Sequence, residues 1–276
     1  DTYTKSPPDV DQNLTIFIGN LTMYEKVKTR ECLRKLYTHN NDALARYLGV
    51  KKSPVTIRFI LGLPKDVYKD KLEEESKIHG DIVILNITEN MNNGKTFEYF
   101  KWFAKHREDN YLLKLDDDSF LHLIHYYRDL QDLPRKRAYY GNAIFNKGSE
   151  TNTFFGGAGY TLTRDLIMDI TGSDWVSSDT VGTEDWLVGN WVCHVAREMK
   201  YFVHYVGFTN HHDPSDKGNR EIECHYGHVL RIRRGIANKE IWNQTLQNTY
   251  KNWFYEAWGF NEGKWYGYYG PMRNSQ

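Results

Sequence analysis

Short apolar runs alternate with longer segments of helical spacing through the first half of the chain. The runs 14–18, 55–61, 81–85 and 111–115 have the length of buried strands, and polar or glycine residues follow them. Between them, segments 24–37, 65–78 and 95–106 have the length and residue pattern of helices. This alternation predicts an α/β fold with one mainly parallel, Rossmann-like sheet flanked by helices.

The second half of the chain is less regular. Residues 139–145 are predicted to form another strand, and a helix signal begins at Thr163. Between them, the segment 154–160 contains three glycines, which are compatible with an ordinary tight turn or with the close approach of another group. The segment lacks the Lys-Ser/Thr ending of a phosphate-binding P-loop.

The chain shows no internal repeat, linker or domain boundary. Residues 1–12 are polar and contain Pro7-Pro8, so we expect a loosely held lead-in, with 13–276 forming a single domain. Residues 242–270 are crowded with aromatic side chains. They predict an irregular, aromatic-rich C-terminal part that packs at the periphery.

Composition limits the classes of function. With 36 basic and 36 acidic side chains among 276 residues, the sequence does not indicate a nucleic-acid partner. Its 15% aromatic content suits sugar stacking and core packing equally. No apolar run approaches the ~20 residues of a membrane span. Asn-x-Ser/Thr sequons at Asn13, Asn20, Asn86 and Asn243 hint at the secretory route.

Three consecutive carboxylates, Asp116, Asp117 and Asp118, follow the apolar run 111–115. Ligands of open α/β sheets bind beyond the carboxyl ends of the strands. If the backbone stays extended, Asp116 and Asp118 point to the same side and offer hard oxygen ligands to Mg²⁺ or Mn²⁺. The alternative is a solvated loop or a helix cap. Apolar residues on both sides of the triplet favour a metal, since negative charges beside a core need compensation.

A second acidic feature is the segment 182–189, Gly-Thr-Glu-Asp-Trp-Leu-Val-Gly. Thr183 is placed to cap a helix that begins at Glu184, so both carboxylates are explained by the helix dipole alone. The functional alternative places Asp185 in the same pocket as the aspartate triplet, where it acts as a base.

Two further groups of residues have both a structural and a functional interpretation. Arg30 and Arg34 lie one helical turn apart. The structural interpretation places both on a solvated helix face, and the functional one places them in contact with a phosphate or uridine. Several histidines follow residue 200, and a neutral imidazole can complete a metal site that two carboxylates begin.

Taken in order, these segments resemble the inverting β-1,3-glycosyltransferase family, which includes β-1,3-galactosyltransferases, fringe and core-1 synthase. The likeness extends from the first strand to about Gly189 and fades beyond residue 190. In the family, the helix with the two arginines ends in a Thr-Trp pair, and in this chain the segment Arg30–Tyr37 has other residues at these two positions. The matching blocks are Arg30–Tyr37, Phe59–Gly62, Glu75–Ile82, Lys95-Thr96, Lys101-Trp102, Leu113–Phe120, Gly156–Tyr160 and Glu184-Asp185.

This resemblance implies a GT-A fold, a UDP-sugar donor and Mn²⁺, with Mg²⁺ as a substitute. By position, Asp118 would ligate the metal, while Asp116 and Asp117 support donor and metal. Asp185 would be the base. A late histidine ligates the metal in family members, and His225 is our choice over His211 and His212. The residues expected to contact the donor or its metal are Arg30, Arg34, Asp116, Asp117, Gly157 and Glu184.

The expected reaction transfers a hexose to a hydroxyl of an oligosaccharide, glycoprotein or glycolipid and forms a β-1,3 linkage with inversion. Galactose is the first expectation for the sugar, before N-acetylglucosamine and glucose. A non-catalytic sugar-binding module and a metal-dependent phosphohydrolase are the alternatives from other classes. The resemblance also implies a type II membrane protein of the Golgi or secretory-pathway lumen, anchored by an N-terminal segment that this sequence does not include.

Overall fold

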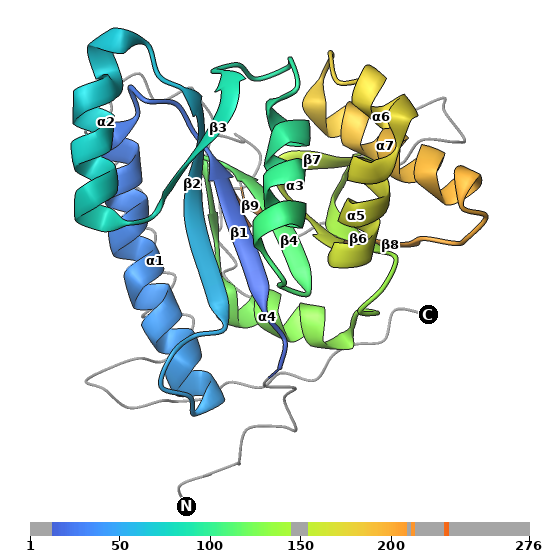
Figure 1. Cartoon of the computed structure of the whole chain (residues 1–276). Coiled ribbons are helices and arrows are strands. Elements are labelled where there is room, and N and C mark those ends of the chain that lie inside the picture. The colour runs from blue at the N-terminus through green and yellow to red at the C-terminus, as the bar shows by residue number, and fades with distance from the viewer. Residues whose placement is uncertain (1–12, 145–153, 209–210, 213–228, 232–276) are drawn as a thin grey trace, which may run out of the picture.

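The computed structural model describes residues 13–144, 154–208, 211–212 and 229–231. Within them, a seven-stranded sheet in the order β3-β2-β1-β4-β7-β6-β8 lies between helices (Figure 1). Its strands are β1 (Ile16–Leu21), β2 (Val55–Leu63), β3 (Ile82–Thr88), β4 (Tyr111–Asp116), β6 (Ala138–Ile144), β7 (Phe154–Thr163) and β8 (His204–Phe208). The helices are α1 (Val27–Leu48), α2 (Asp66–His79), α3 (Lys95–His106), α4 (Leu123–Asp132), α5 (Arg164–Gly172), α6 (Asp174–Ser178) and α7 (Glu184–Glu198).

Within this sheet, β7 alone runs against the common strand direction. β1 to β4 pair in parallel, and β8 pairs in parallel with β6. β7 is antiparallel to both β4 and β6. The predicted α/β fold with a mainly parallel sheet flanked by helices is therefore confirmed. A tight turn at 154–160 is wrong, because these glycines lie in β7 and their backbone pairs with neighbouring strands.

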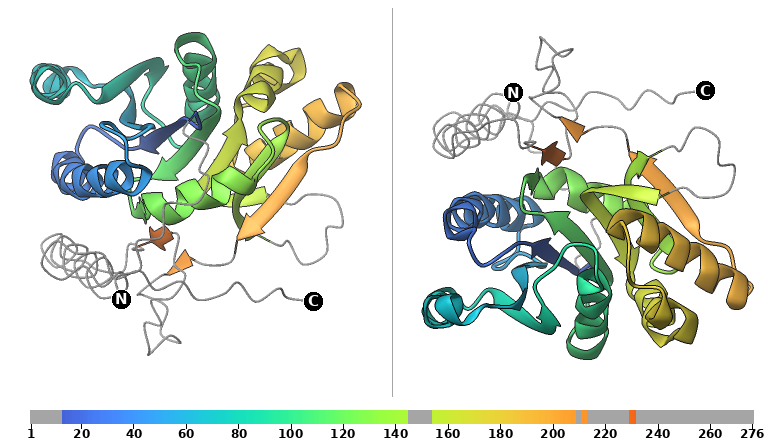
Figure 2. Two further views of the ribbon diagram at one scale, coloured as in Figure 1. Left: turned by 90° about the horizontal axis from the view of Figure 1, so that it is seen from below. Right: turned by 90° about the horizontal axis from the view of Figure 1, so that it is seen from above.

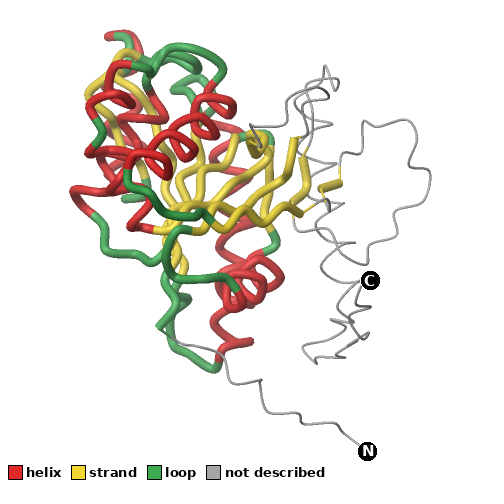
Figure 3. The backbone as a smooth tube through the Cα atoms, turned by 90° about the vertical axis from the view of Figure 1, so that its right-hand side faces the viewer, coloured by secondary structure: helices red, strands yellow, loops and turns green. Residues whose placement is uncertain are grey.

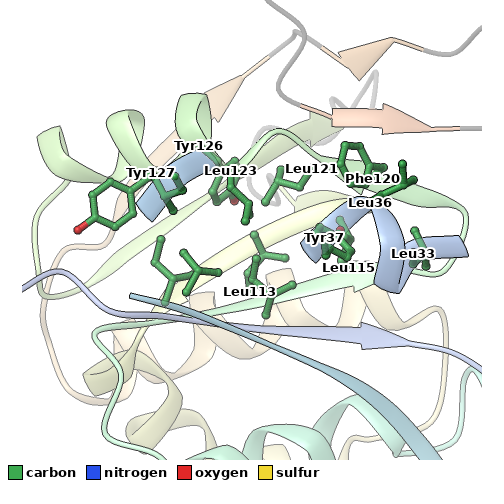
Figure 4. Packing of buried hydrophobic residues seen from close by; sticks show 14 of the residues in the cluster. Leu33, Leu36, Tyr37, Leu113, Leu115, Phe120, Leu121, Leu123, Tyr126 and Tyr127 are labelled. Carbon is green, nitrogen blue, oxygen red and sulfur yellow. The ribbon is translucent and has the colours of Figure 1, made fainter. Parts of the chain in front are cut away.

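Both faces of the sheet are buried, which explains why its strands are apolar runs rather than alternating patterns. On β4, Leu113 and Leu115 face the core shared with α1 and α4 (Figure 4). Leu112 faces the opposite core, which α3, α5 and α7 cover (Figure 2). β4 is thus held from both sides, and its carboxyl end is a rigid place for functional groups.

Helix bounds agree with the sequence where local signals are strong. α3 spans 95–106 as predicted. α1 continues to Leu48, beyond the expected end at Tyr37, because Ala43, Leu44 and Leu48 extend the apolar face that the helix buries. It ends at Gly49, whose φ of 67° is the left-handed conformation that glycine adopts without strain.

A small second sheet begins directly after the aspartate triplet. β5 (Ser119–Leu121) pairs with β10 (Val229–Arg231), which also pairs with β9 (His211–His212); Figure 3 shows these strands beside the large sheet. The chain turns at Asp117 and Asp118 to enter β5. Asp116 and Asp118 therefore do not alternate along one extended strand, so this part of the prediction is wrong.

Two structural expectations concern parts of the chain that lie outside the described residues. They are the lead-in 1–12 and the aromatic segment 242–270, so the single-domain prediction for 13–276 remains a prediction. Among the helices that are described, none combines the length and apolar character needed to span a lipid bilayer.

Candidate active site

The site is built around Lys114, a buried cation on β4. Its side chain is 2% exposed, and its ammonium group is 2.7 Å from Asp116 Oδ1 and 3.5 Å from Asp185 Oδ1. The same ammonium donates a hydrogen bond to Glu184. β4 supplies Lys114 and Asp116, and the first turn of α7 supplies the other two carboxylates. The structure therefore brings together the two acidic motifs that are almost 70 residues apart.

Gly157 of β7 closes the site on one side. Its backbone N–H donates a 2.5 Å hydrogen bond to Asp185 Oδ2. A Cβ atom at this position would overlap Asp116 Oδ2 and lie 3.2 Å from Asp185 Oδ2. The close approach expected at this glycine stretch is confirmed for Gly157, and the approaching groups are the two carboxylates.

The ionisation of these groups is set by burial and by Lys114. Burial raises the pKa of Asp116, against the attraction of Lys114. Burial, joined by the negative charge of Glu184, also raises the pKa of Asp185 well above its usual value. Glu184 differs, because Lys114 and hydrogen bonds outweigh its burial and lower its pKa to about 2. Asp185 is thus the carboxylate of this cluster that most readily takes up a proton.

Glu184 is held by side chains from three other elements. Besides Lys114, Thr96 Oγ1 of α3 donates to its Oε2 at 3.0 Å, and the Tyr160 hydroxyl of β7 donates to the same oxygen at 2.9 Å. These donors satisfy the carboxylate inside the protein. The structure therefore shows Glu184 as a group that positions Lys114 and the start of α7. A direct contact of Glu184 with the UDP-sugar stays a prediction.

A second chain of contacts fixes Asp117. Thr22, which follows β1, donates from its hydroxyl to Asp117 Oδ2 at 2.8 Å. The backbone carbonyl of Thr22 accepts a 2.7 Å hydrogen bond from Lys95 at the start of α3, and Lys95 also contacts Glu89 at 2.5 Å. Burial raises the pKa of Asp117, with Lys26 acting in the opposite direction. The contacts of Asp117 thereby stabilise the turn after β4, and Asp117 remains a candidate for contact with the UDP-sugar.

The predicted metal ligands are placed in part. Asp118 lies in the turn after β4, with Ser119 Oγ 3.2 Å from its Oδ1. His225 lies outside the described residues, while the backbone of His211-His212 forms β9, two strands from β5 in the small sheet. Within the described residues, no three histidine, cysteine or acidic side chains form a metal cluster by themselves.

Arg30 and Arg34 have a different environment from the one expected. Arg30 is fully buried and makes two hydrogen bonds of 2.8 and 2.6 Å to Glu75 of α2. Arg34 contacts Glu75 at 2.7 Å and Asp81 at 2.7 Å. A solvated helix face is therefore wrong for this pair. The guanidinium of Arg30 lies in the interior and holds α1 against α2. A contact of Arg30 or Arg34 with the sugar donor stays a prediction.

Lys114 was not among the site residues predicted from the sequence. Its position could have indicated a role, because a lysine between apolar residues of a buried strand requires carboxylate partners. Thr22 and Tyr160 carried no comparable signal, since each reaches the site only through contacts with residues distant in sequence.

Comparisons with known proteins show which sequences and structures the chain is similar to. The sequence model of the family described as Galactosyltransferase matches residues 28–153, which include α1 to β6 and the aspartate triplet. The β-1,3-galactosyltransferase pvg3 of Schizosaccharomyces pombe is 31% identical over 96 residues, covering 34% of this chain and 24% of pvg3. Over these partial matches, the chain is similar to β-1,3-glycosyltransferases.

A second relative extends the match. The UDP-GalNAc:beta-1,3-N-acetylgalactosaminyltransferase 2 of Xenopus tropicalis is 24% identical over 191 residues, covering 61% of this chain and 37% of that protein. The chain thus spans only about a quarter to a third of the length of these relatives.

Among solved structures, the galactosyltransferase LgtC in complex with donor and acceptor sugar analogs is similar at a TM-score of 0.49. The identity is 11%, and the match covers 84% of this chain and 95% of LgtC. At such a distance the likeness decides nothing about chemistry.

Proposed function

We propose that this chain is the catalytic part of an inverting, metal-dependent β-1,3-glycosyltransferase that uses a UDP-hexose, with galactose as its first donor sugar. The observation that supports this most is the meeting of Asp116, Glu184 and Asp185 around Lys114 at the carboxyl end of the central strand. Both relatives named above have β-1,3 activities on galactose-type sugars in their names.

The charge of the cluster fits a divalent cation. Three carboxylates face the single ammonium of Lys114, so their full ionisation leaves two negative charges uncompensated by this lysine. Among the described residues, no group donates a hydrogen bond to the buried Asp185 Oδ1, and its nearest cation is the Lys114 ammonium at 3.5 Å. Asp118 and Asp116 are the residues of the described part that would hold Mn²⁺, together with diphosphate oxygens and a late histidine. When bound, the metal would supply Lewis-acid neutralisation of the leaving UDP.

Asp185 is the proposed base. Its carboxylate would accept the proton of the acceptor hydroxyl while this oxygen attacks the anomeric carbon from the face opposite to UDP, which inverts the configuration. The pKa raised by burial and by Glu184 gives Asp185 the proton affinity that a base requires. Gly157 fixes the orientation of this carboxylate through its backbone N–H.

Lys114 and Glu184 keep the base in place. The ammonium of Lys114 attracts the carboxylates of Asp116 and Asp185 and thereby holds them next to each other. Glu184 anchors Lys114 without reacting, because the charge of Lys114 and its hydrogen-bond donors keep it ionised in spite of its burial. The proposed acceptor is a glycan hydroxyl on an oligosaccharide, glycoprotein or glycolipid, and the proposed location is the secretory pathway.

The deciding experiment is a screen of UDP-sugars for UDP release in the presence and absence of Mn²⁺ and of simple glycan acceptors. We expect Mn²⁺-dependent release with UDP-galactose ahead of UDP-N-acetylglucosamine and UDP-glucose, and NMR of the product should show a β-1,3 linkage. Binding of sugars without any turnover would instead indicate a sugar-binding module. Phosphate release from a simple ester, with no sugar transfer, would indicate a phosphohydrolase.

A further inference from the structure

The structure distinguishes between sequons that look equivalent in the sequence. Asn20 is fully buried on β1, and its Nδ2 donates a 3.3 Å hydrogen bond to the backbone carbonyl of Asp116. A glycan on this nitrogen would have to leave through the core and would disturb the turn that carries the aspartates. Asn13 is exposed at the beginning of the described chain, and Asn243 lies outside the described residues.

Asn86 has the opposite environment. It lies on β3, whose residues alternate between the two faces of the sheet. Val83 and Leu85 are buried towards α3, whereas Asn86 and the hydroxyl-bearing Thr88 of the same sequon are exposed on the other face. Both residues that define the sequon therefore point to solvent in the folded protein.

A bulky group attached to Asn86 would cover an exposed edge of the sheet. β3 is the edge strand of the seven-stranded sheet, and within the described residues its outer side has no partner strand. Two apolar side chains are exposed nearby: Ile84, which is 40% exposed on the same face of β3, and Leu63 of β2, which is 45% exposed and pairs with Thr88. Exposed apolar edge strands are sites of intermolecular pairing unless something covers them.

We propose that Asn86 is an N-glycosylation site and that its glycan covers the β3 edge. The donor class is a lipid-linked diphospho-oligosaccharide, so the inference rests on the proposed secretory location. In the transfer, a bond forms between Asn86 Nδ2 and the anomeric carbon of the glycan. The bond from that carbon to the diphosphate breaks, the lipid diphosphate leaves with the electron pair, and Nδ2 gives up one proton.

Occupancy is measured on the chain secreted from eukaryotic cells behind a signal peptide. The tryptic peptide 78–95 contains Asn86 and no other sequon. Amidase treatment in heavy-oxygen water converts a glycosylated Asn86 into a labelled aspartate, which mass spectrometry identifies. We expect labelling of Asn86 in most chains and none at Asn20.

Three variants separate the loss of the sequon from a loss of folding. Asn86→Gln and Thr88→Val are expected to lose one glycan step in gel mobility, and Thr88→Ser is expected to keep it. Thr88→Val retains the asparagine and the β-branched shape, so its circular dichroism spectrum reports whether the strand still forms. An unlabelled Asn86 in the folded, secreted protein overturns the proposal.

UDP release by the same preparation tests the proposed function separately. An unmodified Asn86 in an enzyme that releases UDP contradicts the glycan and leaves the transferase in place. A modified Asn86 in a folded protein that turns over no UDP-sugar supports the glycan and contradicts the transferase.

Discussion

Asp185 has two neighbours that act on it in opposite directions. Lys114 attracts its carboxylate from a distance of 3.5 Å, whereas Glu184, next to it in the chain, adds negative charge. Burial and the like charge prevail, and the pKa of Asp185 is raised. An environment of this kind produces a carboxylate that takes a proton and can release it again, as a general base must.

Replacing Asp185 by asparagine tests this role with little change in shape. General-base assistance is worth roughly 10²–10⁴-fold in rate, so Asp185→Asn is expected to lower kcat by about that factor. UDP binding, measured by calorimetry, should stay close to that of the parent protein. Asp174→Asn is the matched control, because Asp174 also lies in the first turn of a helix but is exposed. Undiminished kcat in Asp185→Asn would exclude Asp185 as the base.

Gly157 tests the geometry of the same cluster. The Cβ of Gly157→Ala would overlap Asp116 Oδ2, so the carboxylate or β7 must move. Since a misplacement of about 1 Å costs on the order of 10²-fold in rate, we expect kcat to fall by about that amount. Gly172→Ala is the control, because the Cβ it would add meets no atom within 4 Å apart from its chain neighbours and its own helix backbone. Equal kcat values in the two variants would contradict the crowding at Gly157.

At the level of elements, the first turn of α3 links both acidic motifs. Lys95 holds the backbone of Thr22, whose hydroxyl binds Asp117. The adjacent Thr96 donates to Glu184 at the start of α7. One dipeptide therefore sets the position of the β4 turn relative to α7, although neither residue reaches Asp185 itself.

Thr96→Val removes the hydroxyl and keeps the shape of the side chain. Tyr160 still donates to the same oxygen, so the variant loses one hydrogen bond to a charged group, which is worth about 1.5–3 kcal/mol, and the free energy of unfolding in urea should fall by that amount. We also expect a lower kcat with a nearly unchanged KM for the sugar donor, because α7 carries Asp185, the proposed base. Thr96→Ser keeps the hydroxyl and should restore kcat. A Val variant as active as the Ser variant would show that this hydrogen bond does not position Glu184.

α1 and α2 are held together by a buried ion-pair cluster in which Glu75 meets Arg30 and Arg34. Burial opposes the ionisation of Glu75, but the two guanidiniums outweigh it and lower its pKa. The unfolded chain therefore binds a proton at this glutamate more readily than the folded one. This contribution to stability is present above the pKa of an unfolded glutamate, ~4.3, and is lost as the pH falls through the lower folded value.

Glu75→Gln should consequently lower the free energy of unfolding at neutral pH by about 3–5 kcal/mol, since it leaves the buried guanidinium of Arg30 without its carboxylate, while Arg34 keeps Asp81. The difference from the parent protein should shrink in acid, where the parent also loses this charge. Urea unfolding at a series of pH values measures both. Glu74→Gln is the control, because Glu74 is the exposed neighbour on the same helix. A difference that does not depend on pH would contradict the assigned protonation of Glu75.

At the level of the whole molecule, the site lies where the parallel half of the sheet meets the reversed strand β7. β4 is the last strand of the parallel run, and β7 pairs with it on the other side. α7 packs on β7 and brings Asp185 across to the end of β4. Binding of metal and nucleotide at this junction should therefore stabilise the folded molecule as a unit.

We expect UDP together with Mn²⁺ to raise the melting temperature, whereas UDP with a chelator should not. At ligand concentrations of about 100 times Kd, the stabilisation is ~2.7 kcal/mol. Asp118→Ala is expected to abolish the metal-dependent part. Differential scanning fluorimetry with both proteins measures it. An equal shift in the Asp118→Ala variant would exclude Asp118 as a metal ligand.

The sequence by itself determined the local elements and the acidic motifs that form the candidate site. Apolar runs bounded by polar or glycine residues identify strands such as 111–115, and helical spacing identifies α3, because both signals depend on neighbours within a few residues. The acidic motifs could be located for the same reason, since each is contiguous in the chain.

Only the tertiary structure decided which of these residues meet. The reversed direction of β7, the role of Lys114 and the pairing of Arg30 with Glu75 depend on contacts between residues far apart in sequence. Local patterns carry no information about such partners, because burial and charge compensation are properties of the packed chain. The same reason separates the interior Asn20 from the exposed Asn86, although their sequons are equivalent in the sequence.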